Sequence, residues 1–139
     1  MIKKILLIDD DEDEFYLMKD TLTQIDKTIH FSSIQSPEEV AKGGNCPVPD
    51  LLFLDINMPV RDGFEWLRLI RLKHPALPVV MYSTGNNTTI VEKAYAAGAT
   101  LYFAKPHDLT QFKQDLQALL QLDWSRPEAV TATFRHGSD

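Results

Sequence analysis

Acidic side chains gather at two points where an apolar run of the chain ends. Asp9, Asp10 and Asp11 follow one such run, and Asp55 follows another. Carboxylates that lie close together raise each other's pKa by repulsion, and a divalent cation removes this conflict. Mg²⁺ prefers oxygen ligands, commonly one or two carboxylates together with water and a phosphate. The sequence therefore predicts a magnesium site, provided that the fold brings these aspartates together.

Three later side chains fit chemistry on a phosphoryl group. A carboxylate such as that of Asp55 can act as a nucleophile and form an aspartyl phosphate. The negative charge of the transferred group must then be neutralised. Ser83 and Lys105 each end a further apolar run, so a hydroxyl and an ammonium are available beside the metal for this purpose.

The elements that must position these residues follow from hydrophobic patterning. Five apolar runs alternate with segments of helical spacing, and we expect them to form strands at Ile5–Ile8, Ile29–Ile34, Leu51–Leu54, Val79–Tyr82 and Leu101–Ala104. This alternation predicts an α/β fold with a parallel sheet covered by helices on both faces. Right-handed crossovers leave few topologies for such a sheet. Among these we expect the common doubly wound, five-stranded order 2-1-3-4-5, with its site at the carboxyl ends of the strands.

Helix ends also leave local signals. Pro37 followed by two glutamates predicts the start of a short helix, with a loose segment at 43–45. Gly98 is expected to end the helix before the last strand. Asp108 and Gln111 have the spacing of an N-cap and a capping box, which predicts the start of the final helix.

Composition excludes several classes of protein. The chain has 139 residues and a net charge of −6, which argues for one compact domain and against general binding to nucleic acid or an anionic membrane. Cys46 is the only cysteine, so no internal disulfide can form. The apolar run at Ile5–Ile8 is too short for a signal peptide or a membrane span, and we expect a cytoplasmic location. The four histidines are scattered and show no metal-ligand spacing.

Four motifs occur in a fixed order. They are Ile8-Asp9-Asp10, Leu54-Asp55-Ile56-Asn57-Met58-Pro59 with Gly63, Met81-Tyr82-Ser83, and Tyr102-Phe103-Ala104-Lys105-Pro106. This series resembles the signature of response-regulator receiver domains of two-component signalling, of the single-domain, chemotaxis-regulator type. The resemblance covers residues 1 to about 122. It implies a flavodoxin-like fold and a phosphoryl group delivered to Asp55 by a histidine kinase or phosphotransfer protein. Such a domain is not a conventional enzyme, although it catalyses its own phosphorylation and dephosphorylation.

The resemblance also implies a ligand set for Mg²⁺. Asp10 would bind the metal directly, and Asp9 would assist through water. Asp55 and the main-chain carbonyl of Asn57 would complete the protein ligands.

Further roles come from the same resemblance. Ser83 would bond a phosphoryl oxygen, and Lys105 would pair with Asp55 or its phosphate. Tyr102 would turn inward when Ser83 moves, which would change the face formed by the fourth helix, the last strand and the last helix. The peptide bond between Lys105 and Pro106 would be cis.

Two positions depart from the commonest pattern of the family. Thr84 stands where the residue is usually very small, and its β-branched side chain could narrow access to Asp55. Gly85 supplies no side chain to guide an attacking water. These differences bear on the lifetime of the phosphorylated form.

Other interpretations of the same residues are open. The acidic run from Asp9 to Asp13 could be a solvated turn at a helix start. It could also be the Asp-x-Asp motif of a haloacid-dehalogenase-like phosphatase, although Asp13 and the missing late acidic pair do not fit. A third possibility is a receiver-like binding module that is no longer phosphorylated, against which the intact Asp55, Ser83 and Lys105 argue.

Residues 123–139 form a tail that we expect to be too short for an output domain. Trp124 and Phe134 would fold back onto the domain or serve in docking. Any output would then pass through an unknown protein target. A homodimer is also plausible, because one face carries an apparent surplus of apolar residues at Ile90, Val91, Tyr95, Leu116 and Leu120.

Overall fold

The computed structural model describes residues 2–9, 11–34, 48–56, 63–83 and 88–132. Its strands are β1 (Lys4–Ile8), β2 (His30–Ile34), β3 (Leu51–Asp55), β4 (Val79–Ser83) and β5 (Leu101–Ala104). Its helices are α1 (Glu12–Ile25), α3 (Gly63–Lys73), α4 (Thr88–Ala96), α5 (Leu109–Leu120) and α6 (Pro127–Ala132). The strands form one parallel sheet of order β2-β1-β3-β4-β5, which confirms the predicted topology. The helix predicted after Pro37 lies outside the described residues.

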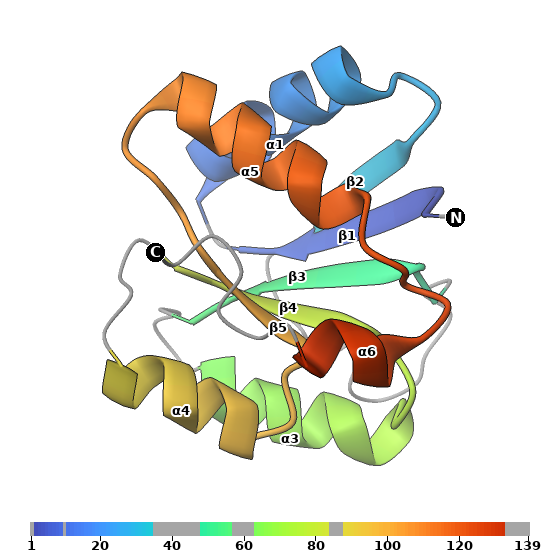
Figure 1. Cartoon of the computed structure of the whole chain (residues 1–139), viewed down its shortest axis with the longest axis vertical. Helices are drawn as coiled ribbons and strands as arrows, with labels where there is room; N and C mark the ends of the chain where they lie inside the picture. Colours follow the sequence, from blue (N-terminus) through green and yellow to red (C-terminus); the bar gives the residue numbers. More distant parts are fainter. Residues whose placement is uncertain (1, 10, 35–47, 57–62, 84–87, 133–139) are drawn as a thin grey trace.

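The sheet is the middle layer of the molecule. Helices α1 and α5 cover one face, and α3 and α4 cover the other (Figure 1). Successive side chains of a strand point to opposite faces. Because helices cover both faces, the inner strands β1, β3 and β4 and the edge strand β5 are apolar almost throughout. The side chains on the α1/α5 face include Ile5, Leu7, Leu51, Phe53, Val80, Tyr82, Leu101 and Phe103. Those on the α3/α4 face include Leu6, Ile8, Leu52, Leu54, Val79, Met81, Tyr102 and Ala104.

The end of α4 agrees with the prediction from the sequence, and the start of α5 agrees with it only in part. Gly98 follows α4 with a positive φ of 103°, a conformation that glycine adopts without a steric penalty, and the predicted helix end is confirmed. At the start of α5 the Asp108 side chain accepts the Thr110 N–H at 3.2 Å, as an N-cap should. The predicted capping box is wrong, because the Gln111 amide donates to the Asp115 carboxylate at 2.7 Å. The Gln111 side chain can turn toward the Asp115 carboxylate or back toward the Asp108 N–H. The bond to a charged acceptor one helical turn away is the stronger of the two.

The segment after α5 is part of the core. Trp124 is 7% exposed, and its indole N–H donates to the Leu119 carbonyl at 3.0 Å. Val130 of α6 is buried in the same cluster, on the α1/α5 face of the sheet. The prediction that Trp124 folds back is confirmed, whereas Phe134 lies outside the described residues. The sequence analysis did not predict α6, which begins at Pro127 in the first helical turn, where proline is well tolerated.

The expected apolar surplus on α4 and α5 is smaller than predicted. Val91 and Leu116 are buried, and they lie in clusters on opposite faces of the sheet. Ile90 and Leu120 are partly buried against the same clusters, so Tyr95, which is 56% exposed, is the most exposed of the five. The helical periodicity overestimated the exposed apolar area of α4 and α5. Each helix buries a wider part of its surface than the single apolar stripe that we assumed. No helix among the described residues combines the length and apolar character needed to cross a bilayer.

Candidate functional site

The carboxyl ends of β1, β3, β4 and β5 bring the predicted residues to one edge of the sheet. Ile8 pairs with Leu54, which places Asp9 and Asp55 side by side at the ends of β1 and β3. Ser83 ends β4 beside Ala104. The backbone of Lys105 extends this ladder by donating its N–H to the Ser83 carbonyl at 2.7 Å. Four predicted residues from four strand ends therefore share one edge, as the strand order requires.

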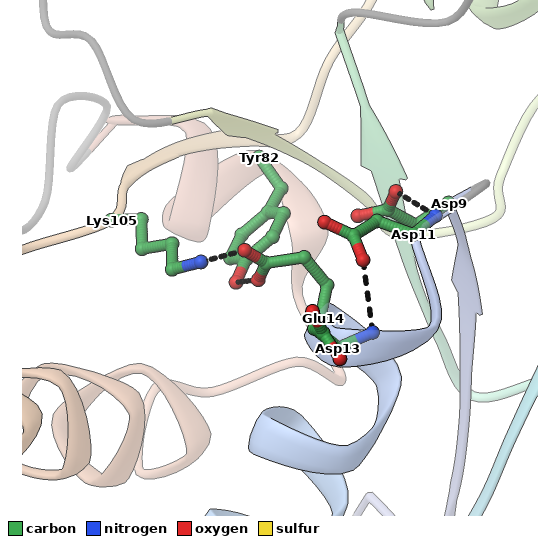
Figure 2. Close-up of polar contacts among 6 residues, drawn as sticks. All are labelled: Asp9, Asp11, Asp13, Glu14, Tyr82 and Lys105. Carbon is green, nitrogen blue, oxygen red and sulfur yellow. Dashed lines mark hydrogen bonds and ion pairs between the residues drawn. The ribbon is translucent and has the colours of Figure 1, made fainter.

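The first turn of α1 is fixed by two aspartates. Asp9 is 7% exposed, and its Oδ1 accepts the Asp11 N–H at 3.0 Å. The Asp11 side chain in turn caps α1 by accepting the Asp13 N–H at 2.9 Å. Figure 2 shows these two carboxylates next to each other at the start of the helix. Negative charge at a helix N-terminus is favourable, since it faces the positive end of the helix dipole.

Glu14 joins α1 to the ends of β4 and β5. Its Oε2 accepts a hydrogen bond from the Tyr82 hydroxyl at 2.7 Å, and its Oε1 forms an ion pair with Lys105 Nζ (Figure 2). The Lys105 ammonium also lies 5.9 Å from the centroid of the Tyr82 ring. The side chains of Lys105 and Glu14 are only 15% and 20% exposed. Lys105 was predicted from the sequence as a site residue, whereas Glu14 and Tyr82 were not.

Burial shapes the electrostatics of this group. It raises the pKa of Tyr82 well above its ordinary value, and the charges of Asp9 and Asp55 raise it further. The Tyr82 hydroxyl is thus a firm hydrogen-bond donor. Burial also lowers the pKa of Lys105, while Asp9 and Asp11 act in the opposite direction. The effect of both carboxylates on Tyr82 agrees with the strand register, which places Asp9 and Asp55 at neighbouring strand ends.

Ser83 and Tyr102 meet on the α3/α4 side of the sheet. Tyr102 is fully buried, and its side chain forms a hydrogen bond with that of Ser83. Burial raises the pKa of Tyr102, and this bond lowers it in part. The Tyr102 ring is therefore oriented inward in this structure. The Ser83 bond and the surrounding apolar cluster hold the ring inside the core.

Gly63 allows α3 to begin directly against the end of β3. Its N–H donates to the Ile56 carbonyl at 2.9 Å. A Cβ at this position would lie 2.6 Å from the Asp55 carbonyl oxygen and 2.8 Å from the Ile56 Cα. Only a residue without a side chain fits such an approach, so Gly63 contributes to the placement of Asp55.

The sequence profile of the response regulator receiver domain matches residues 5–117. The chain belongs to this family. One relative is the sensory transduction protein BceR of Halalkalibacterium halodurans, 30% identical over 118 residues, 85% of this chain and 50% of that protein. The chain thus spans about half the length of BceR, and 22% of the DNA-binding transcriptional regulator NtrC of Klebsiella pneumoniae, which it also matches.

Solved receiver structures agree with the fold. The phosphorylated cyanobacterial phytochrome response regulator RcpA is 25% identical and has a TM-score of 0.75, covering 86% of this chain and 91% of its own. The Mn²⁺-bound form of response regulator Rcp1 is also 25% identical, with a TM-score of 0.73 and coverage of 84% and 91%. Membership in this family favours a signalling domain over the phosphatase alternative.

The predicted metal ligands of this receiver domain are only partly described. Asp9 and Asp55 lie at neighbouring strand ends, whereas Asp10 and Asn57 lie outside the described residues. Within the described part of the chain, no three histidine, cysteine or acidic side chains form a metal-binding group. The two described carboxylates are of the ligand class that Mg²⁺ prefers, and their position at neighbouring strand ends fits a divalent cation.

One backbone prediction is wrong. The described residues include Lys105 and Pro106, and no cis peptide bond occurs among them. Even before proline the trans form is favoured by about 0.5–1 kcal/mol.

Proposed function

We propose that this receiver domain accepts a phosphoryl group on Asp55 from a histidine kinase or phosphotransfer protein. The observation that carries the proposal is the position of Asp55. It ends the central strand β3, partly exposed, with Asp9 beside it on one neighbouring strand and Ser83 at the end of the other. A carboxylate at such a strand end is accessible to a phosphodonor while its backbone stays fixed in the sheet.

The surrounding residues have complementary roles in this proposal. Asp9, Asp10, Asp55 and the Asn57 carbonyl would hold Mg²⁺, which when bound supplies positive charge to offset that of the phosphoryl group. The Ser83 hydroxyl would donate to a phosphoryl oxygen. The Lys105 ammonium would stabilise the negative charge that develops there.

Labelling with acetyl phosphate tests the proposal. Mass spectrometry should place one phosphoryl group on Asp55 of the native chain, and saturating chelator should abolish the reaction. Asp55→Asn should remain unlabelled, because the amide is not a nucleophile for this transfer. Asp50→Asn is a matched control, since Asp50 lies at the opposite end of β3 and accepts the N–H groups of Lys3 and Lys4. Equal labelling of Asp55→Asn and the native chain would refute the assignment.

The output of the domain is also part of the proposal. Phosphorylation would alter the face made by α4, β5 and α5, and a protein target would bind there. The target could be an unidentified protein or a second copy of this chain. The exposed Tyr95 of α4 is available on that face. Tyr102, the hydrogen-bond partner of Ser83, is buried in one cluster with Val91 and Ala94 of α4.

A further inference from the structure

The Glu14 carboxylate has an unusual local position. Asp11 and Glu14 occupy the N-cap and third helical positions of α1, which is the spacing of a capping box. In a capping box the acidic side chain would reach back to the N-cap N–H. Here that N–H donates to Asp9 Oδ1 instead. Glu14 is therefore released from its usual local role and reaches across to β4 and β5.

Tyr82 fixes the orientation of this carboxylate. Its ring is 2% exposed and packs edge-on against Phe53 and face-on with Phe103, at centroid distances of 6.1 and 6.0 Å. Its hydroxyl then holds one oxygen of Glu14 at 2.7 Å. With the ring immobilised by its neighbours, the second oxygen of Glu14 is presented to Lys105.

Lys105 thus has a defined anionic partner before any phosphoryl group arrives. We propose that Glu14 is a positioning residue that holds the Lys105 ammonium in the unphosphorylated chain and competes with the phosphoryl group of Asp55 for it. This inference rests on the proposed function of Asp55. An ammonium already neutralised by Glu14 attracts an incoming phosphoryl group less strongly, so Glu14 biases the domain toward its unphosphorylated state.

Beryllofluoride, which mimics a phosphoryl group on aspartate, provides the binding test. Glu14→Gln keeps the size of the side chain and can still accept the Tyr82 hydrogen bond, but it removes the charge. We expect it to bind beryllofluoride about three to ten times more tightly than the native chain, an effect of the size that the net contribution of one ordinary hydrogen bond gives. Glu12→Gln is the matched control, since it removes the same charge from an exposed position in the same helical turn.

Lys105→Met separates a direct role from a general effect of charge. In that background Glu14→Gln should no longer tighten binding, because the two residues act as a coupled pair. Tightening equal to that of Glu12→Gln, or tightening that persists without Lys105, would overturn the inference.

An NMR signal keeps this inference distinct from the proposed function. The Lys105 Nζ resonance of the native chain, assigned by its loss in Lys105→Met, should shift in Glu14→Gln but not in Glu12→Gln without any beryllofluoride. An unmoved resonance would show that Glu14 does not hold Lys105. If the native chain neither binds beryllofluoride nor becomes phosphorylated on Asp55, the proposed function is refuted instead. The Lys105 resonance would then still show whether Glu14 forms an ion pair with Lys105.

Discussion

Single atoms at the end of β3 determine how Asp55 is presented. The backbone of Gly63 approaches the Asp55 carbonyl so closely that an added Cβ would lie 2.6 Å from it. This neighbour is main chain in a central strand, which cannot move aside as a flexible side chain would. The geometry of Asp55 thus depends on a residue that performs no chemistry.

Gly63→Ala should therefore impair both folding and phosphorylation. We expect the free energy of unfolding to fall by about 1–3 kcal/mol, the usual cost of overpacking, measured by urea denaturation. The folded fraction should also label more slowly with acetyl phosphate, because the end of β3 must shift.

Gly98→Ala is the comparison for this prediction. Its φ of 103° also disfavours alanine, but its added Cβ would meet the Arg71 side chain rather than the site. It should destabilise the fold while leaving the labelling rate of folded molecules unchanged. Equal slowing in both variants would contradict a specific role for Gly63.

In the proposed function, the helices and strands around Asp55 would transmit the effect of its phosphorylation. Ser83 at the end of β4 is hydrogen-bonded to Tyr102 in β5, and Tyr102 packs in the cluster that also contains Val91 and Ala94 of α4. A phosphoryl oxygen that draws on the Ser83 hydroxyl must change this bond. Coupling then needs two arrangements of the elements with different affinities for the phosphoryl group.

Beryllofluoride should accordingly shift amide resonances in a defined pattern. We expect large changes at 83, 88–96 and 101–105 and in α5, beyond those at the site itself. In Tyr102→Leu the shifts in α4 and α5 should shrink, because the link between Ser83 and the cluster is removed. Shifts confined to the surroundings of Asp9 and Asp55 would refute a switch in these elements.

At the scale of the whole molecule, the segment after α5 closes the core. Trp124 packs in the cluster beneath α1 and α5 and bonds the carbonyl of Leu119, and Val130 of α6 joins it. Trp124 lines a pocket together with Ile2, Asp50 and Pro78, which precede β1, β3 and β4, so it lies at the end of the sheet opposite to the one that carries Asp55. The folding unit therefore extends past residue 122.

Trp124→Ala should lower the free energy of unfolding by about 3–5 kcal/mol, as expected when a large buried aromatic is truncated. Chemical denaturation followed by circular dichroism measures this. Leu109→Ala is the control, since Leu109 is 64% exposed and its truncation should cost little. A loss no greater than that of Leu109→Ala would mean that the tail does not stabilise the domain.

Local pattern was sufficient for much of this protein. Apolar runs predicted every described strand to within about one residue, and their alternation with helices led to the order of the sheet. That order alone places Asp9, Asp55, Ser83 and Lys105 at one edge, because parallel strands share their carboxyl ends. The residue types at those ends then indicated metal and phosphoryl chemistry, and the family match supports that interpretation.

Tertiary structure decided the partners of individual side chains. Glu14 meets Tyr82 and Lys105 across 68 and 91 residues of sequence, and no local pattern reports such contacts. Trp124 packs in the core, a position that its local sequence left undecided between core and surface. Strand positions follow from the large free energy of burying whole apolar runs. The choice of partner depends on differences of about 1 kcal/mol, which only the assembled packing resolves.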